Sequence, residues 1–172
     1  MKKLLFIFIL ISSVLVNAQD FRNAKWRASL EEIKKSETAK LIKETDRVLM
    51  YSGNVNGKRT SIQYLFSDSG LYKINVNFNV KDSHDYSSII DNHVKMISQF
   101  TEEYGRPKQS LANWLRLYVD SDKEKKKHII THRVAKGMNS EMTWISEASK
   151  VELKLALSER KAPVHRIIFS SL

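Results

Sequence analysis

Histidine is the residue type in this sequence best suited to bind a metal ion or to act as a base. Five occur: His84, His93, His128, His132 and His165. None belongs to a His-Glu-x-x-His helix of the zinc-binding kind. His128 and His132 fall in a segment that alternates like a strand, where four residues span about 13 Å, too far for one metal ion. His93 lies on an apolar helical face, which favours a buried histidine with satisfied hydrogen bonds over a functional one.

Two acidic clusters could bind a cation. Asp82, His84 and Asp85 are close in sequence, but helix capping explains the two carboxylates without a metal. Asp120-Ser121-Asp122 resembles the start of a calcium loop and lacks the later glycine and glutamate, which favours a turn. We therefore expect neither a metal nor another cofactor.

Other catalytic chemistry finds no support in the residues. The chain has no cysteine and no Gly-x-Ser-x-Gly nucleophile turn, and its five glycines do not form a phosphate-binding loop. Several aromatic residues could line a sugar or lipid pocket, but their helical or strand spacing favours the core. These are Trp26, Tyr86, Phe100, Tyr104 and Trp144.

The first 18 residues have the pattern of a cleavable signal peptide. Lys2 and Lys3 precede an apolar run over 4–16, and Val16-Asn17-Ala18 supplies the small residues of a cleavage site. The run is shorter than the roughly 20 residues of a membrane-spanning helix. We expect cleavage after Ala18, export to the periplasm or cell exterior, and no transmembrane segment in the mature protein.

The mature chain is basic. The net charge of +10 falls to +8 once Lys2 and Lys3 are removed. In an exported protein such a charge favours anionic lipid or acidic polysaccharide over nucleic acid as a partner, although it can also serve solubility alone. The one cluster, at 123–127, is expected at a solvated hairpin tip. The residues expected to contact an anionic surface are Lys123, Lys125, Lys126 and Lys127.

Hydrophobic periodicity predicts two helices and many strands. Ser29 and Glu32 form a capping box that begins a short helix, and three strands follow over 47–80, with Asn56-Gly57 as a hairpin turn. In the third strand, Tyr72 and every second residue to Val80 face the core, and Asn77 faces solvent. In the strand over 151–157, Leu155 faces the core and Lys154 faces solvent. Asp82 or Ser83 caps a longer helix with Asp85 in its first turn, and Gly105 ends it.

The remainder of the chain is expected to be strands, over 113–119, 128–134, 142–146, 151–157 and 164–169. This order predicts an α+β fold in which helices cover one face of an antiparallel sheet. Residues 19–172 form one domain, with two helix-plus-meander halves at 19–81 and 82–172.

Trp26 to Ile33, with the sequence Trp-Arg-Ala-Ser-Leu-Glu-Glu-Ile, resembles a Trp-Gly-x-Ser-x-x-Glu-Val motif of small, uncharacterised exported bacterial proteins; Arg27 replaces the usual glycine. The helix end at 104–107 (Tyr-Gly-Arg-Pro) and the Trp144 strand are similar too. These proteins also look like β-lactamase-inhibitor proteins and small outer-membrane assembly factors, so the resemblance implies binding rather than catalysis.

Three functions remain open from the sequence. The first is a non-enzymatic binding or accessory protein of the periplasm or cell exterior that uses the exposed sheet face or a hairpin tip. The second is an envelope-associated protein that binds anionic glycan or lipid through its lysines. The third is an enzyme without a recognisable motif. A cleft with convergent polar groups, an apolar cavity or an exposed aromatic patch would distinguish among them.

Overall fold

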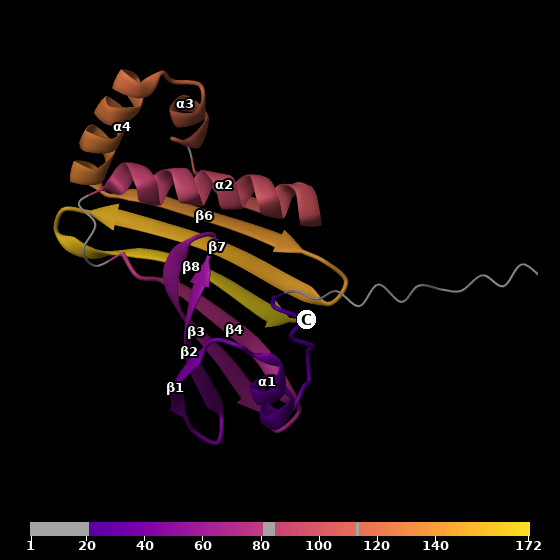
Figure 1. Ribbon diagram of the computed structural model, residues 1–172. Helices are drawn as coiled ribbons and strands as arrows, with labels where there is room; N and C mark the ends of the chain where they lie inside the picture. The colour runs from indigo at the N-terminus through magenta and orange to yellow at the C-terminus, as the bar shows by residue number, and fades with distance from the viewer. Residues whose placement is uncertain (1–20, 81–84, 113) are drawn as a thin grey trace, which may run out of the picture.

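The fold is an eight-stranded antiparallel sheet with four helices, seen in a computed structural model that describes residues 21–80, 85–112 and 114–172 (Figure 1). The signal-peptide segment lies outside these residues. No helix among the described residues is both long and apolar enough to cross a membrane. The elements are α1 (Leu30–Ser36), β1 (Lys40–Glu44), β2 (Val48–Val55), β3 (Lys58–Ser67), β4 (Gly70–Phe78), α2 (Tyr86–Tyr104), β5 (Gln109–Leu111), α3 (Leu115–Val119), α4 (Lys123–Lys136), β6 (Met138–Ile145), β7 (Ser149–Ser158) and β8 (Lys161–Ser171).

The strand order is β1-β2-β3-β4-β8-β7-β6-β5, so the pairing of β4 with β8 joins an N-terminal and a C-terminal meander. Residues directly opposite one another point to the same face. One such row crosses six strands and is almost fully buried; it contains Leu49, Tyr64, Ile74, Phe169, Val151 and Trp144. The α+β prediction is therefore confirmed.

The helices pack against this buried face of the sheet. Phe100 of α2 makes edge-to-face ring contacts with Trp144 and Phe169. Glu37, the C-cap residue of α1, accepts a 2.6 Å hydrogen bond from Tyr64 of β3. Since Trp144 and Tyr64 belong to the same row, α1 and α2 cover the same face, and α4 and α3 lie beyond α2 (Figure 1).

The local signals that begin and end elements are confirmed. Ser29 and Glu32 form the capping box of α1. Asn56 and Gly57 both have positive φ, 51° and 77°, as their hairpin turn requires. Gly105 ends α2 with a φ of 78°. Asp85 is the N-cap of α2 and accepts a 3.2 Å hydrogen bond from the Ser88 amide, so its expected place in the first turn was one residue too late.

The alternation predicted for β4 fails at its first residues. The register shifts between Leu65 and Phe66 of β3, so that Phe66 pairs with Leu71 while Leu65 pairs with Lys73. Tyr72 is the extra residue of this bulge and is 41% exposed, and Leu71 takes its place in the core. From Ile74 to Phe78 the predicted alternation holds.

The predicted strands at 113–119 and 128–134 are wrong, because residues 115–119 form α3 and residues 128–134 lie in α4. Residues 120–122 join the two helices, and the lysine cluster lies in α4 instead of at a hairpin tip. Asp122 caps α4 by accepting a 2.9 Å hydrogen bond from the Lys125 amide, and Gly137 ends it with positive φ. The short edge strands β1 and β5 were not predicted.

The polar side chains on the second face of the sheet are less exposed to solvent than the alternating pattern predicts. Phe78 and Leu155 are buried as predicted, but Asn77 and Lys154 are half-buried instead of exposed. Both lie on central strands, and Lys154 forms ion pairs with Glu141 of β6 at 2.8 Å and with Glu152 at 3.1 Å. Neighbouring side chains therefore partly cover this face of the sheet.

Candidate functional site

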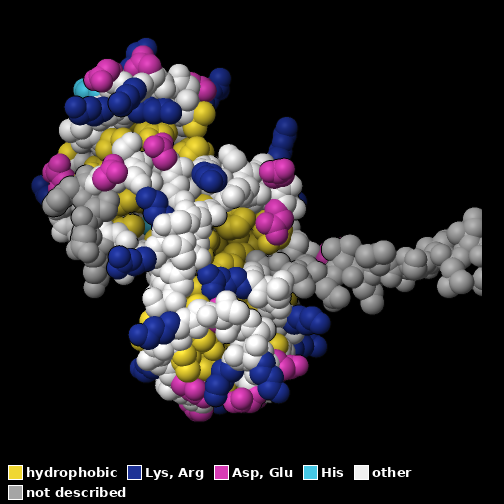
Figure 2. Space-filling view, viewed as in Figure 1, with side chains coloured by type: hydrophobic (Ala, Val, Ile, Leu, Met, Phe, Trp, Pro, Cys, Tyr) yellow, Lys and Arg dark blue, Asp and Glu magenta, His cyan; other side chains and the backbone are white. Residues whose placement is uncertain are grey.

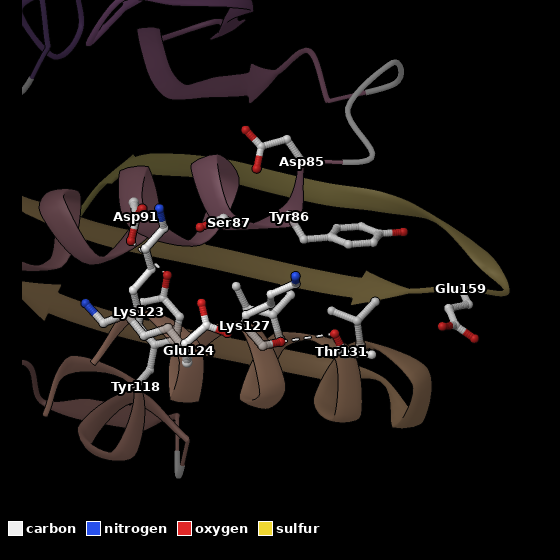
Figure 3. Close-up of a pocket in the computed structure, with 13 residues that line it drawn as sticks. Asp85, Tyr86, Ser87, Asp91, Tyr118, Lys123, Glu124, Lys127, Thr131 and Glu159 are labelled. Carbon is white, nitrogen blue, oxygen red and sulfur yellow. Dashed lines mark hydrogen bonds between the residues drawn. The ribbon is translucent and has the colours of Figure 1, made fainter. Parts of the chain in front are cut away.

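A cleft of about 860 Å³ separates the N-terminal half of α2 from α4 (Figure 3). Glu159, in the turn between β7 and β8, closes one end of it. Tyr86 projects from α2 toward that end. Most lining residues belong to α2 and α4: Asp85, Tyr86, Ser87, Asp91, Lys123, Glu124, Lys126, Lys127, Ile130, Thr131 and Val134, with Tyr118 from α3.

The floor of the cleft is apolar and the upper parts of its walls are charged. Ile130 and Val134, one turn apart on α4, are buried beside the half-buried Tyr86. In the space-filling view, a row of lysine and arginine side chains along α4 borders apolar atoms beneath it (Figure 2). An apolar base with a few polar groups is the usual composition of a ligand site.

Tyr118 fixes the helices around the cleft. Its hydroxyl donates a 2.8 Å hydrogen bond to Asp91 of α2, and its ring packs edge-to-face on Trp114. Lys126 of α4 lies 5.0 Å from the centre of the same ring. Burial and the hydrogen bond to Asp91 raise the pKa of Tyr118 to about 12, so the phenol remains a neutral donor.

The structure brings three of the four predicted contact lysines into the cleft. Lys123, Lys126 and Lys127 line it, whereas Lys125 lies outside the lining and pairs with Asp122 at 3.7 Å. Within the described part of the chain, the ammonium groups of Lys123 and Lys127 form no hydrogen bond or ion pair, and the Lys127 carbonyl accepts a 3.0 Å hydrogen bond from the Thr131 hydroxyl (Figure 3). Across the cleft, Asp91 already accepts from Tyr118. The α4 wall therefore offers the ammonium groups of Lys123 and Lys127 to a ligand, beside the Glu124 carboxylate of the same helix.

A second cluster of reactive residue types lies inside the core. His93 Nε2 is 2.8 Å from Ser140 Oγ, and His93 Nδ1 is 3.4 Å from His165 Nε2. The ring of Phe78 stacks on His165 at 4.4 Å. Burial, together with the nearby His165, lowers the pKa of His93 well below its ordinary value, and burial lowers the pKa of His165 to about 4. Both imidazoles are neutral at pH 7.

The serine–histidine distance would suit nucleophilic catalysis, but the groups are enclosed. Ser140, His93 and His165 are 2%, 0% and 3% exposed. A cavity of about 90 Å³ reaches His165, and Ser140 is not among its lining residues. The expectation that His93 is a satisfied core histidine is confirmed; its buried partner His165 was not predicted.

The remaining candidate residues from the sequence lie in the core, at a helix cap or outside the described residues. Asp82 and His84 lie outside the described residues, and Asp122 is a helix cap. Trp144 is fully buried, and Trp26, Phe100 and Tyr104 pack against the core as expected. Tyr86 also packs there but lines the cleft. Within 21–80, 85–112 and 114–172, no three His, Asp or Glu side chains gather as a metal site.

The sequence analysis missed the cleft because it assigned α4 as a hairpin. Ile130, His132 and Val134 alternate like a strand, yet the same residues fit a helix. The helix signal was present: Asp122 is a good N-cap, Gly137 is a good terminator, and Lys-Glu-Lys-Lys-Lys consists of helix-forming residues. The spacing of four between Trp114 and Tyr118 was a further indication.

Comparisons of this chain with protein-family models, curated proteins and solved structures find no match. The class of protein is therefore defined by the fold and site alone: an α+β protein with helices on one face of an antiparallel sheet and a charged cleft between two of those helices.

Proposed function

We propose that this chain is an exported, non-enzymatic binding protein whose ligand occupies the cleft between α2 and α4. The observation that carries the proposal is the cleft itself: about 860 Å³, with an apolar floor and lysines on one wall. That volume lies in the range of small-molecule sites, roughly 300–1,000 Å³. The signal-peptide pattern of residues 1–18 supports export.

We take the ligand to be amphipathic, with an anionic group that meets the lysines of the α4 wall and other polar groups that meet the lining carboxylates Asp85, Asp91, Glu124 and Glu159. Ile130 and Val134 would contact the apolar part. The ammonium groups of the three lining lysines, Lys123, Lys126 and Lys127, would contact the anion. The Lys126 ammonium group also lies 5.0 Å from the centre of the Tyr118 ring. A charged group beside an apolar floor fixes the orientation of such a ligand.

Anilinonaphthalene sulfonate, which joins aromatic rings to a sulfonate, is a suitable probe. We expect the folded chain to bind it with increased fluorescence, and the variant K126S/K127S to bind at least about tenfold more weakly. The control variant K40S/K43S removes two exposed lysines from β1 and should bind like the unchanged chain. Equal binding by K126S/K127S, or no binding by the unchanged chain, would refute the cleft as the ligand site.

A second function, attachment to an anionic envelope surface, is favoured by the position of the four predicted contact lysines in the first half of α4. Exposed Leu117 and Val119 on α3 lie nearby in sequence. Attraction of about 1 kcal/mol per basic residue would be weakened by salt. Replacing all four lysines by serine should cost about 1 kcal/mol of stability through lower helix propensity and abolish co-sedimentation with phosphatidylglycerol vesicles at low salt. Absence of vesicle binding by the unchanged chain would exclude this function.

The two functions predict different salt and lysine dependence. A cleft ligand needs Lys126 and Lys127, and its apolar contacts persist in salt. Surface attachment also uses Lys125, which is not part of the cleft lining. Export itself is tested by N-terminal sequencing of the protein from its host. A mature protein that starts at Met1 would contradict cleavage after Ala18.

A further inference from the structure

His128 and His132 lie on one outward face of α4. Both side chains are exposed, and their rings are nearly parallel, 11° apart, with centroids separated by 6.2 Å. In a helix, four residues advance about 6 Å along the axis and return to nearly the same face. The helix thus removes the 13 Å separation that a strand would have imposed.

The nitrogen atoms of both rings are available to a ligand. Within the part of the chain that the structure describes, the two rings contact each other, and neither forms a hydrogen bond or ion pair. Each side chain has two rotatable bonds, and both are free to turn in solvent. Two histidines at this spacing are the element that binds zinc in His-x-x-x-His helices. Imidazole nitrogen suits Zn²⁺, Cu²⁺ and Ni²⁺.

We propose that His128 and His132 form a two-histidine binding site for a divalent transition-metal ion on the outer face of α4. No third His, Asp or Glu side chain among the described residues joins them, so water fills the remaining coordination positions. Such an open site binds a metal more weakly than a closed structural site with four protein ligands. It also leaves positions for a ligand atom from a second molecule.

The two imidazole ligands set the expected order of metal affinity, and the nearby charges set its salt dependence. Copper should bind more tightly than nickel or zinc, in the usual order of affinity for nitrogen ligands. Lys125 and Lys136, three residues before and four residues after the pair, repel a cation, and the single acidic neighbour Glu124, four residues before His128, offsets part of this repulsion. Because salt screens that repulsion, moderate salt should not weaken metal binding, unlike attachment to an anionic surface.

Metal binding would also stabilise the cleft wall. A chelate between His128 and His132 bridges one turn of α4, the helix that carries Lys126 and Lys127. An ion that binds the folded chain and not the unfolded chain raises the melting temperature with ion concentration. The proposal does not depend on what the cleft binds, since the pair lies outside the cleft lining.

Calorimetric titration of the tag-free chain with Cu²⁺, Ni²⁺, Zn²⁺ and, as a negative control, Mg²⁺ tests the proposal. We expect one transition-metal ion per chain and at least about a tenfold loss of affinity in H132Q. The variant H132R/R133H keeps the composition but places the histidines five residues apart, on different faces of the helix. Its affinity should fall as in H132Q.

Circular dichroism would establish that each variant retains its fold. We expect this result, because the side chains of His128 and His132 are exposed. Binding weaker than about 1 mM by the unchanged chain would overturn the proposal. So would retention of full affinity by H128Q/H132Q, because another group would then hold the ion. Melting curves with and without Ni²⁺ should show that the ion stabilises the unchanged chain. This stabilisation should disappear in H132Q and in H132R/R133H.

Discussion

The buried pair His93 and His165 should make the fold sensitive to mild acid. The ordinary pKa of histidine is about 6.5 in an unfolded chain, and that of His165 in the fold is about 4. As pH falls below 6.5, the unfolded chain takes up the proton first, so the folded state loses stability. The penalty is absent above pH 6.5 and complete below pH 4.

The magnitude follows from the difference between the two pKa values. About 2.5 pH units at 1.36 kcal/mol each amounts to about 3 kcal/mol for His165 alone. His93 adds to this loss, because burial and the nearby His165 lower its pKa in the same direction. Such a loss is a large part of the 5–15 kcal/mol, in rough terms, that stabilises a typical domain.

Urea denaturation followed by tryptophan fluorescence between pH 7.5 and about pH 4.5 measures this effect. The free energy of unfolding should fall steadily with pH in the unchanged chain and less steeply in H165Q. H128Q/H132Q, which removes the exposed pair, should keep the original slope. A stability that stays constant over this range, or an unchanged slope in H165Q, would refute the reasoning. Imidazole proton resonances give an independent measurement, since two histidines should not titrate above pH 5.

Three further predictions concern stability. Phe78→Ala should cost about 3–5 kcal/mol through lost transfer energy and a cavity, whereas Asn77→Ala on the other face should cost roughly 0.5–1 kcal/mol; equal losses in urea melts would contradict the assigned register. Gly70→Ala should cost at least about 2 kcal/mol in urea melts, because Gly70 has a φ of 93° and an added Cβ would lie 2.2 Å from the backbone oxygen of Arg27. The control Gly57→Ala should cost less, because nothing lies within 4 Å of its added Cβ. Glu37→Gln should cost about 1–3 kcal/mol in thermal melts, since the carboxylate accepts hydrogen bonds from Arg22, Tyr64 and the Ala39 amide; a variant as stable as the unchanged chain would show that this network contributes nothing.

Local patterns in the sequence predicted the fold class, the buried face of β4 and β7, and the helix ends at Ser29 and Gly105. These features depend on side-chain periodicity and on the backbone preferences of single residues, which neighbours in sequence reveal. Asn56-Gly57 is the clearest case, because its turn type needs positive φ whatever the rest of the chain does.

The same local patterns failed where two periodicities fit the same residues. Ile130, His132 and Val134 satisfy both a strand and a helix, and only packing selects between them. In the fold, Ile130 and Val134 lie against α2 and the sheet while His132 faces solvent, an arrangement that only a helix allows. The bulge at Tyr72 also depends on the partner strand β3, which the sequence of β4 does not contain.

The sequence by itself thus determined which residues are apolar, where α1 begins and α2 ends, and that the chain is basic with a signal-peptide pattern. Only the tertiary structure decided that Lys126 and Lys127 border a cleft, that His93 meets His165 and Ser140, and that His128 and His132 are neighbours. Contacts of this kind join residues distant in sequence or depend on a helix chosen by packing, and local periodicity carries no information about them.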